Sequence, residues 1–287
     1  MKNVSFSLEN TNEYYGRIDG QRFFIGKRVS YEGNKGLANT RGNSILKYNR
    51  FNYQPEFGFW ADFIHPTSVA EGGFYHALNT YDRAHFTFTF LQYAAHVPNG
   101  DLVNYLRSLL ALPLAKEYFP DLINHKGRIS KITDYGIVPL ESDESTAKLI
   151  DYLNPSVKEI EDTEVIIAAK FVHWAMNDPL HRRVQVDIGI KHFKENMFSY
   201  ANRYSLDKAD DVVCLVISDI RHQGRAKSAE IIGAMNTQKP LDSLLKLGEP
   251  KYHNRLVTLK SEIKKLIEDG SLGNRRYSIS KRDFLNK

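Results

Sequence analysis

The chain has 287 residues, of which 42% are hydrophobic, 25% charged and 12% aromatic, and its formal net charge is +5. A chain of this length and composition folds as one large domain or as two lobes around an ordinary hydrophobic core. The mild positive charge suits an anionic partner such as bacterial cell wall, a membrane surface or nucleic acid, but it selects none of them.

The cysteine count and the apolar pattern exclude further classes. The single cysteine, Cys214, lies in the apolar run 212–217, so the fold is not a disulfide scaffold and the thiol should be buried. No stretch approaches the roughly 20 apolar residues of a membrane span, and the N-terminus lacks the apolar core of a secretory signal. We expect synthesis in the cytoplasm without a signal peptide, and delivery to a cell wall by lysis or by a dedicated secretion system.

In chain order, residues 1–55 are rich in glycine and contain short strand-like runs, which predicts an irregular or strand-rich segment packed on the body. Residues 56–72 have helical spacing that ends at Gly72-Gly73. Pro66 interrupts this spacing, so that either a helix ends near His65 or a new helix starts at Pro66.

The remainder of the chain is dominated by helical patterns. A short extended stretch is predicted at 126–137, and long helical patterns cover 143–153, 155–176, 180–201, 207–220, 225–235 and 251–268. Together these elements predict an α+β protein that is mainly helical. A small β-hairpin element would lie beside a helical lobe and leave a groove between them.

The most informative segment is 71–92, EGGFYHALNTYDRAHFTFTFLQ. Glu71 stands at the end of the predicted helix, where the helix dipole disfavours an ionised carboxylate. Asp82 follows in a turn-rich stretch. This order suits glycosidic bond cleavage, which needs a protonated carboxyl group and often a second, ionised one.

An alternating strand over 86–90 follows this turn-rich stretch. Its phenylalanines should form a buried face, because side chains alternate between the two faces of a strand. By the same alternation, Thr87 and Thr89 should face the groove or solvent.

This arrangement resembles the lysozyme-like superfamily. Residues 87–92, TFTFLQ, are similar to the GFGLMQ segment of goose-type lysozymes and soluble lytic transglycosylases. Glu71, Asp82 and Thr87 resemble the Glu–Asp–Thr set of phage lysozymes, although Thr89 stands where these enzymes have glycine. The resemblance covers about residues 60–100, and a weaker one lies at 218–226, SDIRHQGRA, which is similar to a helix–Gly–helix segment of the second lobe.

The resemblance implies a lysozyme-like two-lobed fold, with residues 56–287 as the catalytic domain of a muramidase-like glycoside hydrolase that uses no cofactor. Glu71 would be the general acid, Asp82 the second carboxylate, and Thr87 or Thr89 would hold a water. The side chains expected to line the sugar sites are Tyr81, Thr89, Gln92 and His222.

Other interpretations stay open. Glu71 alone could act as acid and then base, as in lytic transglycosylases. The chain could instead cleave chitosan or chitin, or bind cell wall or nucleic acid without catalysis. Turn chemistry alone favours an aspartate at position 82.

No metal or cofactor is expected, because none of the ten histidines has a ligand-type spacing. Peptidoglycan or a related polysaccharide is the expected partner, with an immunity or inhibitor protein if the chain is a toxin. Nucleic acid is not the favoured partner.

Overall fold

The computed structural model describes residues 1–287 and divides the chain into two compact units. The first unit contains Met1–Lys47 and Gly72–Ile188, and the second contains Tyr48–Glu71 and Gly189–Lys287. Each unit is therefore built from two separate segments, and the boundary falls inside the long helix α7 (Pro179–Tyr204). That residues 56–287 form a catalytic domain stays a prediction.

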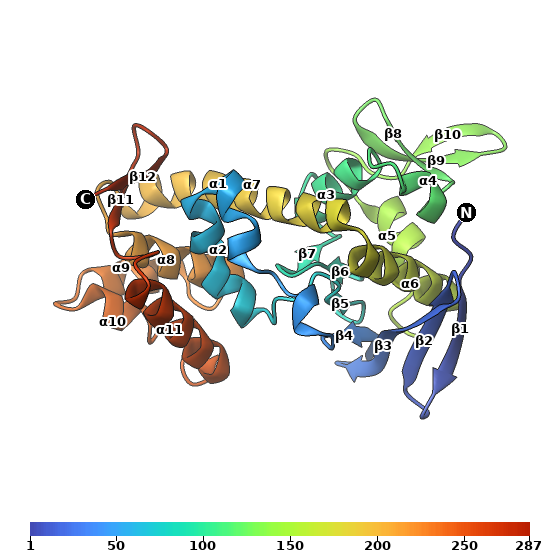
Figure 1. The fold of residues 1–287 in the computed structure, drawn as a ribbon, viewed down its shortest axis with the longest axis horizontal. Helices are drawn as coiled ribbons and strands as arrows, with labels where there is room; N and C mark the ends of the chain where they lie inside the picture. The colour runs from blue at the N-terminus through green and yellow to red at the C-terminus, as the bar shows by residue number, and fades with distance from the viewer. The chain divides into compact units, whose positions relative to one another are not determined.

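An antiparallel seven-stranded sheet organises the first unit, with its strands in sequence order (Figure 1). Its first four strands form a meander with consecutive antiparallel pairing. The strands are β1 (Ser5–Glu9), β2 (Glu13–Ile18), β3 (Gln21–Tyr31), β4 (Asn34–Asn39), β5 (Leu78–Asn79), β6 (Thr87–Phe88) and β7 (Tyr93–Ala94).

A glycine in this sheet serves close packing. Gly16 lies in the middle of β2, where an added Cβ would stand 2.8 Å from Cζ of Phe23 and 3.0 Å from Cδ1 of Ile25. The bare backbone therefore lets two core side chains of β3 lie directly across it. The glycine content of residues 1–55 thus reflects strand packing as well as turns.

The predicted alternating strand over 86–90 is largely wrong. Only Thr87 and Phe88 are extended in β6, and Thr89 has a φ of 90°, which breaks the alternation. Thr89 is fully buried and Thr87 is 6% exposed. Neither threonine faces solvent, contrary to the expectation. Both faces of this short strand are covered because the segment runs through the interior of the first unit.

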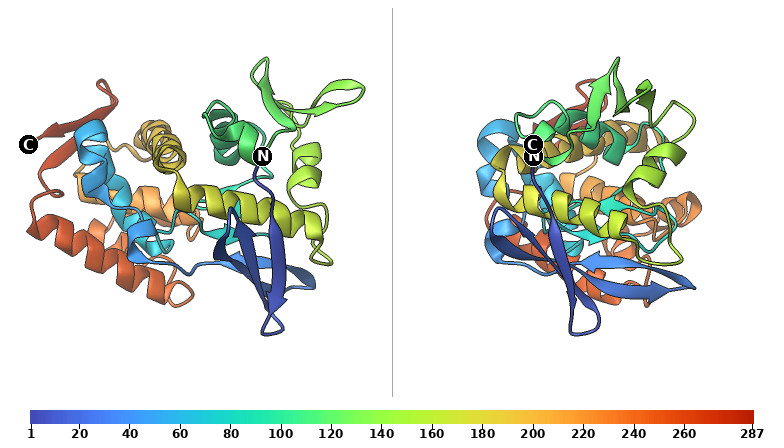
Figure 2. Two further views of the ribbon diagram at one scale, coloured as in Figure 1. Left: turned by 45° about the vertical axis from the view of Figure 1, so that its right-hand side comes forward. Right: turned by 90° about the vertical axis from the view of Figure 1, so that its right-hand side faces the viewer.

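Helix α6 (Asp162–Asn177) packs on β1, β2 and β3 (Figure 2). Aromatic side chains fill the core of this unit, with the rings of Phe88 and Phe171 5.3 Å apart. The other elements here are η1 (Ser44–Leu46), α3 (Asp101–Leu109), α4 (Ala115–Tyr118), α5 (Ala147–Leu153) and a three-stranded sheet of β8 (Leu122–His125), β9 (Arg128–Thr133) and β10 (Gly136–Pro139).

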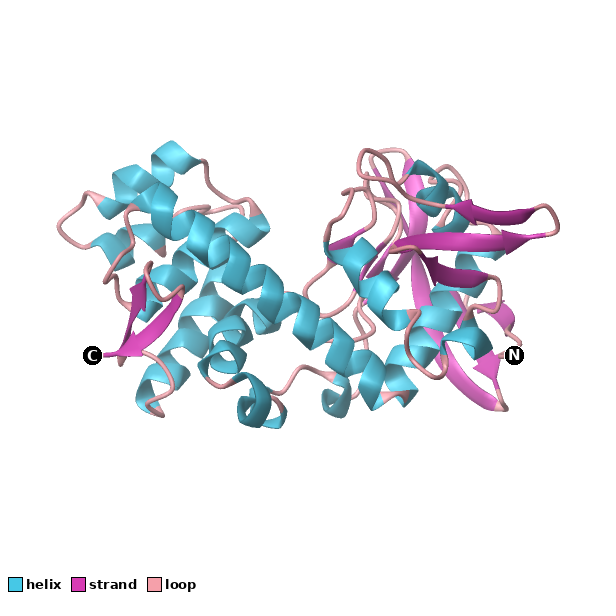
Figure 3. Cartoon of the chain, turned by 90° about the horizontal axis from the view of Figure 1, so that it is seen from above, coloured by secondary structure: helices cyan, strands magenta, loops and turns pink.

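The second unit is helical apart from one hairpin (Figure 3). Helix α2 (Phe59–Ala70) packs along α11 (His253–Glu268). Phe284 of the C-terminal hairpin packs against Trp60 and Phe63, and its ring centroid lies 5.0 Å from that of Phe63. The elements are η2 (Arg50–Asn52), α1 (Gln54–Phe57), α2 (Phe59–Ala70), the second part of α7, α8 (Asp211–Gln223), α9 (Ser228–Met235), α10 (Pro240–Leu244), α11 (His253–Glu268), β11 (Arg275–Ser278) and β12 (Asp283–Asn286).

The α+β class is confirmed, but the expectation of a mainly helical protein is wrong. Helices contain 44% of the residues and strands 21%. The difference comes from the extent of the N-terminal meander, which lies in the segment predicted to be irregular or strand-rich, and from the hairpin β11–β12, which the sequence pattern did not reveal. Helix α2 also runs through Pro66 without ending there. None of the helices combines the length and the apolar sequence that a membrane crossing requires.

Candidate functional site

Glu71 follows the last turn of α2 in the second unit. Its backbone N–H donates to Thr67 O at 3.0 Å, and Gly72, with a φ of 91°, ends the helix immediately afterwards. The prediction that Glu71 caps the C-terminus of a helix is confirmed. Its side chain is 16% exposed, so water and a ligand can reach the carboxylate.

Arg255 of α11 holds this carboxylate. Its Nη1 donates to Glu71 Oε1 at 2.6 Å and to Gln223 Oε1 at 3.0 Å, while its Nη2 donates to Asp219 Oδ1 at 2.6 Å. Arg255 therefore bridges a reachable carboxylate and a buried one. Glu71 and Arg255 stand 184 residues apart in the chain, and the packing of α2 along α11 brings them together.

A second arginine completes the network. Arg225 Nη1 donates to the other oxygen of Asp219, and Arg225 Nε donates to Leu247 O at 3.1 Å. The side chains of Asp219 and Arg225 are both fully buried. We call the chain of ion pairs Arg225–Asp219–Arg255–Glu71 the charge network.

Burial and pairing oppose each other in this network. Burial alone would raise the pKa of Asp219, but Arg255 and Arg225 outweigh it, so that this pKa lies below its usual range. Burial would lower the pKa of Arg255, but Asp219 and Glu71 raise it above its usual value. The two positive and two negative charges cancel, which is how a protein interior tolerates ionised groups.

His222 lies one turn after Asp219 on the same face of α8, because residues three apart are neighbours on a helix. Its Nε2 is 3.7 Å from Glu71 Oε1. Burial lowers the pKa of His222 and the nearby Glu71 only partly offsets this, so the ring is neutral at neutral pH. The structure thus brings together two of the residues predicted for the site, Glu71 and His222.

The remaining predicted residues belong to the first unit, where their side chains take part in local structure. They are Tyr81, Asp82, Thr87, Thr89 and Gln92. Asp82 Oδ1 accepts from Ala84 N at 2.8 Å, and Asp82 Oδ2 accepts from Asn79 Nδ2 at 2.9 Å. The ring of Tyr81 meets Tyr31 edge-on at 6.3 Å. Asp82 therefore has both carboxylate oxygens engaged in local structure.

The threonines and the glutamine of this segment are similarly engaged. Thr89 N donates to Ala77 O at 3.0 Å, and its hydroxyl accepts from Leu91 N at 3.3 Å. Gln92 Nε2 donates to Thr89 O at 3.4 Å. Thr87 pairs with Asn79 of β5 and with Ala94 of β7. These contacts fix the short strands of the sheet.

Sequence reasoning missed Arg255, Asp219 and Arg225. Asp219 and Arg225 lie within 218–226, where the weaker resemblance had suggested only His222. Arg255 has no local signal, because an arginine in an exposed-looking helix is common. No group of three or more His, Cys, Asp or Glu side chains is arranged to hold a metal ion.

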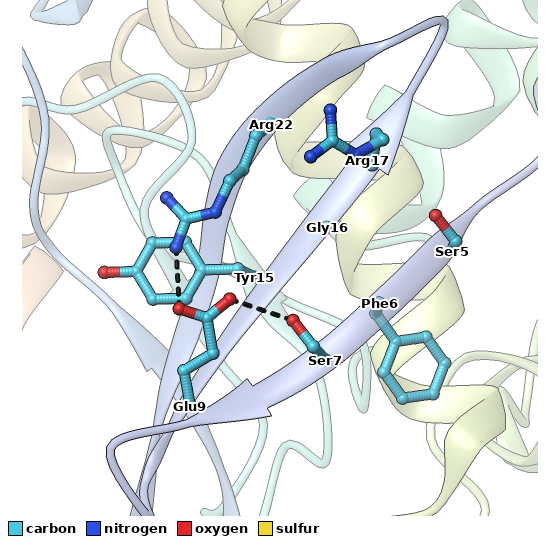
Figure 4. A pocket seen from close by; sticks show the side chains of 8 residues that line it. All are labelled: Ser5, Phe6, Ser7, Glu9, Tyr15, Gly16, Arg17 and Arg22. Carbon is cyan, nitrogen blue, oxygen red and sulfur yellow. Dashed lines mark hydrogen bonds and ion pairs between the residues drawn. The ribbon is translucent and has the colours of Figure 1, made fainter.

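A separate pocket of about 190 Å³ lies over β1, β2 and β3 of the first unit (Figure 4). The guanidinium of Arg22 stacks over the ring of Tyr15 at 3.8 Å and pairs with Glu9 at 2.8 Å. Ser7 also donates to Glu9, at 2.9 Å. These side chains satisfy one another, so the charge network is the stronger candidate for a functional site.

Comparisons of the chain with protein-family models, with curated proteins and with solved structures found no match.

Proposed function

We propose that the protein cleaves glycosidic bonds in peptidoglycan or a related polysaccharide, with Glu71 as the general acid. The observation that carries the proposal is the charge network, in which two buried arginines and a buried aspartate hold one reachable carboxylate in place. Burying three charged side chains costs free energy that a surface ion pair does not. We interpret this arrangement behind one reachable carboxylate as the positioning of a catalytic group.

The chemistry requires a proton on Glu71 when the glycosidic oxygen leaves. Arg255 attracts the ionised carboxylate in the free protein, as opposite charges at this distance do. Glu71 would take this proton from solvent before the bond breaks and donate it to the leaving glycosidic oxygen. A positive charge beside Glu71 would disfavour its protonated form, and the neutral ring of His222 adds no such charge. In this proposal the two compact units are the lobes of a lysozyme-like fold.

One variant tests the role of Glu71. Glu71→Gln keeps an oxygen that can accept from Arg255 but cannot donate an acid proton. We expect solubilisation of purified cell wall to fall about 10²–10⁴-fold, the usual contribution of general acid catalysis. The matched control is Glu268→Gln, which removes an exposed carboxylate of α11 whose partner is Lys264. Equal rates for wild type and Glu71→Gln would refute the assignment, and so would inactivity of the wild type.

A one-carboxylate mechanism is the second candidate. It is favoured by Asp82, both of whose oxygens accept hydrogen bonds within its own turn. A lytic transglycosylase needs only one carboxyl group, because the substrate's own hydroxyl acts as the nucleophile. Mass spectra of the released fragments distinguish the two: reducing ends indicate hydrolysis, and anhydro ends indicate transglycosylation.

A further inference from the structure

Gln223 is a further polar side chain next to Glu71, and the general acid mechanism gives it no role. It is the last residue of α8 and precedes Gly224, which ends the helix with a φ of 71°. Its amide oxygen accepts from Arg255 Nη1 at 3.0 Å, and the same nitrogen donates to Glu71 Oε1 at 2.6 Å. The amide of Gln223 and the carboxylate of Glu71 are therefore neighbours that share one donor atom.

The contact with Arg255 fixes which way round this amide lies. A guanidinium group has only donors, so it must face the oxygen of Gln223 and not the nitrogen. The nitrogen, Nε2, has no acceptor within the protein, and the side chain is partly exposed. Unlike the buried and unpartnered Nε of Arg255, Gln223 Nε2 is open to solvent. A free pair of N–H donors thus lies beside the proposed acid, already oriented before a ligand arrives.

These donors select for an acceptor on the ligand. Among the groups that an amino sugar carries near its glycosidic bond, the acetamido carbonyl only accepts, a hydroxyl both donates and accepts, and the ammonium group of a de-N-acetylated sugar only donates. An ammonium group at this place would meet the N–H donors of Gln223 and the positive charge of Arg255. A site that hydrogen-bonds one polar group of its substrate rejects an analogue that lacks this group. Gln223 therefore favours an N-acetylated sugar.

We propose that Gln223 is a specificity-determining residue, which donates from Nε2 to the acetamido carbonyl of an N-acetylated sugar at the bond that Glu71 cleaves. This inference rests on the proposed function, since it places the cleaved bond against Glu71. Because one atom of Arg255 holds both side chains, binding of the acetamido group also positions the sugar relative to the acid. The N-acetyl group thereby becomes a feature that the protein recognises.

The test compares the cleavage of purified peptidoglycan with that of the same material after chemical removal of its N-acetyl groups. New chain ends are counted, and the ratio of the two rates is the N-acetyl preference. Changes in the acidity of Glu71 cancel in this ratio, because both substrates meet the same acid. Chemical re-acetylation of the treated material should restore the wild-type rate, which excludes damage to the glycan.

Two variants separate the donor from the contact with Arg255. Gln223→Leu removes the donor at similar volume, and we expect the N-acetyl preference to fall about tenfold, the effect of about one hydrogen bond. Gln223→Glu keeps an oxygen for Arg255 and replaces the N–H donors by a second acceptor. We expect this variant to reverse the preference, because a carboxylate pairs with the ammonium group of the de-N-acetylated sugar.

The matched control is Gln238→Leu, the same change at an exposed position of this unit, which should keep the wild-type preference. A wild type that cleaves both materials equally overturns the inference, and so does a wild-type preference retained by Gln223→Leu or by Gln223→Glu. These outcomes leave the role of Glu71 intact, because cleavage of the untreated material still occurs. Absence of cleavage by the wild type refutes the proposed function, and this inference with it.

Discussion

Asp219 is the residue on which the charge network depends, because it accepts from both arginines. Its side chain is fully buried, so no water can replace either contact. Removing its charge would leave the buried Arg225 without an acidic partner and Arg255 paired with Glu71 alone. Leaving a buried charge without its partner is one of the few effects of a single substitution that cost several kcal/mol.

We predict that Asp219→Asn lowers the free energy of unfolding by about 3–5 kcal/mol, the usual cost of breaking a buried ion pair from one side. Asparagine has nearly the same volume, so the loss reports charge and not packing. Urea denaturation provides the measurement, with Asp242→Asn as a control at an exposed position of α10. Equal stability losses in the two variants would show that Asp219 is not structurally important.

Glu164 is a second buried carboxyl group, in the first unit, and it behaves differently because no cation pairs with it. Its Oε1 accepts from the Thr80 hydroxyl at 2.5 Å, and its Oε2 has no partner. The side chain is fully buried. Burial raises the pKa of Glu164 to about 7, although the Thr80 bond lowers it in part.

This raised pKa predicts the sign of a pH effect. Between pH about 4.5 and about 7 the folded state holds a proton that the unfolded state has lost, so stability falls as the pH rises through this window. Each pKa unit corresponds to about 1.4 kcal/mol, which gives an upper bound of about 3 kcal/mol. Glu164→Gln lacks this titration. The free energy of unfolding of the variant minus that of the wild type should therefore be more positive at pH 8 than at pH 5.

Thermal unfolding of the wild type and of Glu164→Gln at the two pH values measures this difference. Glu144→Gln, at an exposed position of the same unit, is the matched control and should show no such dependence. A stability difference between Glu164→Gln and wild type that stays constant from pH 5 to pH 8 would contradict the protonated state assigned to Glu164.

At the scale of elements, three helices create the candidate site. Helix α2 ends at the catalytic candidate, α8 carries Asp219 and His222 on one face, and α11 supplies Arg255 from its first turn. Their mutual packing therefore determines the geometry of the charge network. The sheet of the first unit depends instead on close backbone packing at Gly16.

We predict that Gly16→Ala destabilises the first unit by about 1–3 kcal/mol, the typical cost of overpacking a core. The new methyl group would stand 2.8 Å from Phe23 Cζ, and that ring is itself buried. Gly233→Ala in α9 is the control, because nothing lies within 4 Å of the position that its new methyl group would take. That change should be neutral or stabilise the helix by up to about 1 kcal/mol. A harmless Gly16→Ala would mean that β2 and β3 are packed less closely than the structure shows.

For the whole molecule, local patterns predicted the α+β class, most of the long helices and the position of Glu71 at a helix end. They did not predict how much of the chain is strand, because the glycines of β2 and β4 resemble turn glycines until their neighbours in space are known. Local sequence patterns also could not predict the charge network. Its members come from three helices and the turn after α8, and only folding places Arg255 beside Glu71.

The prediction of an exposed Thr-bearing strand failed for a related reason. Alternation assigns faces correctly only while the backbone stays extended, and here the left-handed residue Thr89 ends the strand after two residues. The resemblance implied Asp82 as a second carboxylate, whereas turn chemistry alone also favours an aspartate there, and in the structure the turn uses both of its oxygens. That Asp82 or Thr87 takes part in catalysis stays a prediction.

The central claim is that Glu71 supplies the proton for bond cleavage, and the rate at which new chain ends appear in purified peptidoglycan tests it most directly. Reducing and anhydro ends are counted per molecule of wild type and of Glu71→Gln, under conditions where both proteins give the same unfolding profile. We predict steady formation of ends by the wild type and a rate at least about 10²-fold lower for Glu71→Gln. Formation of ends at the same rate by both proteins would contradict the account.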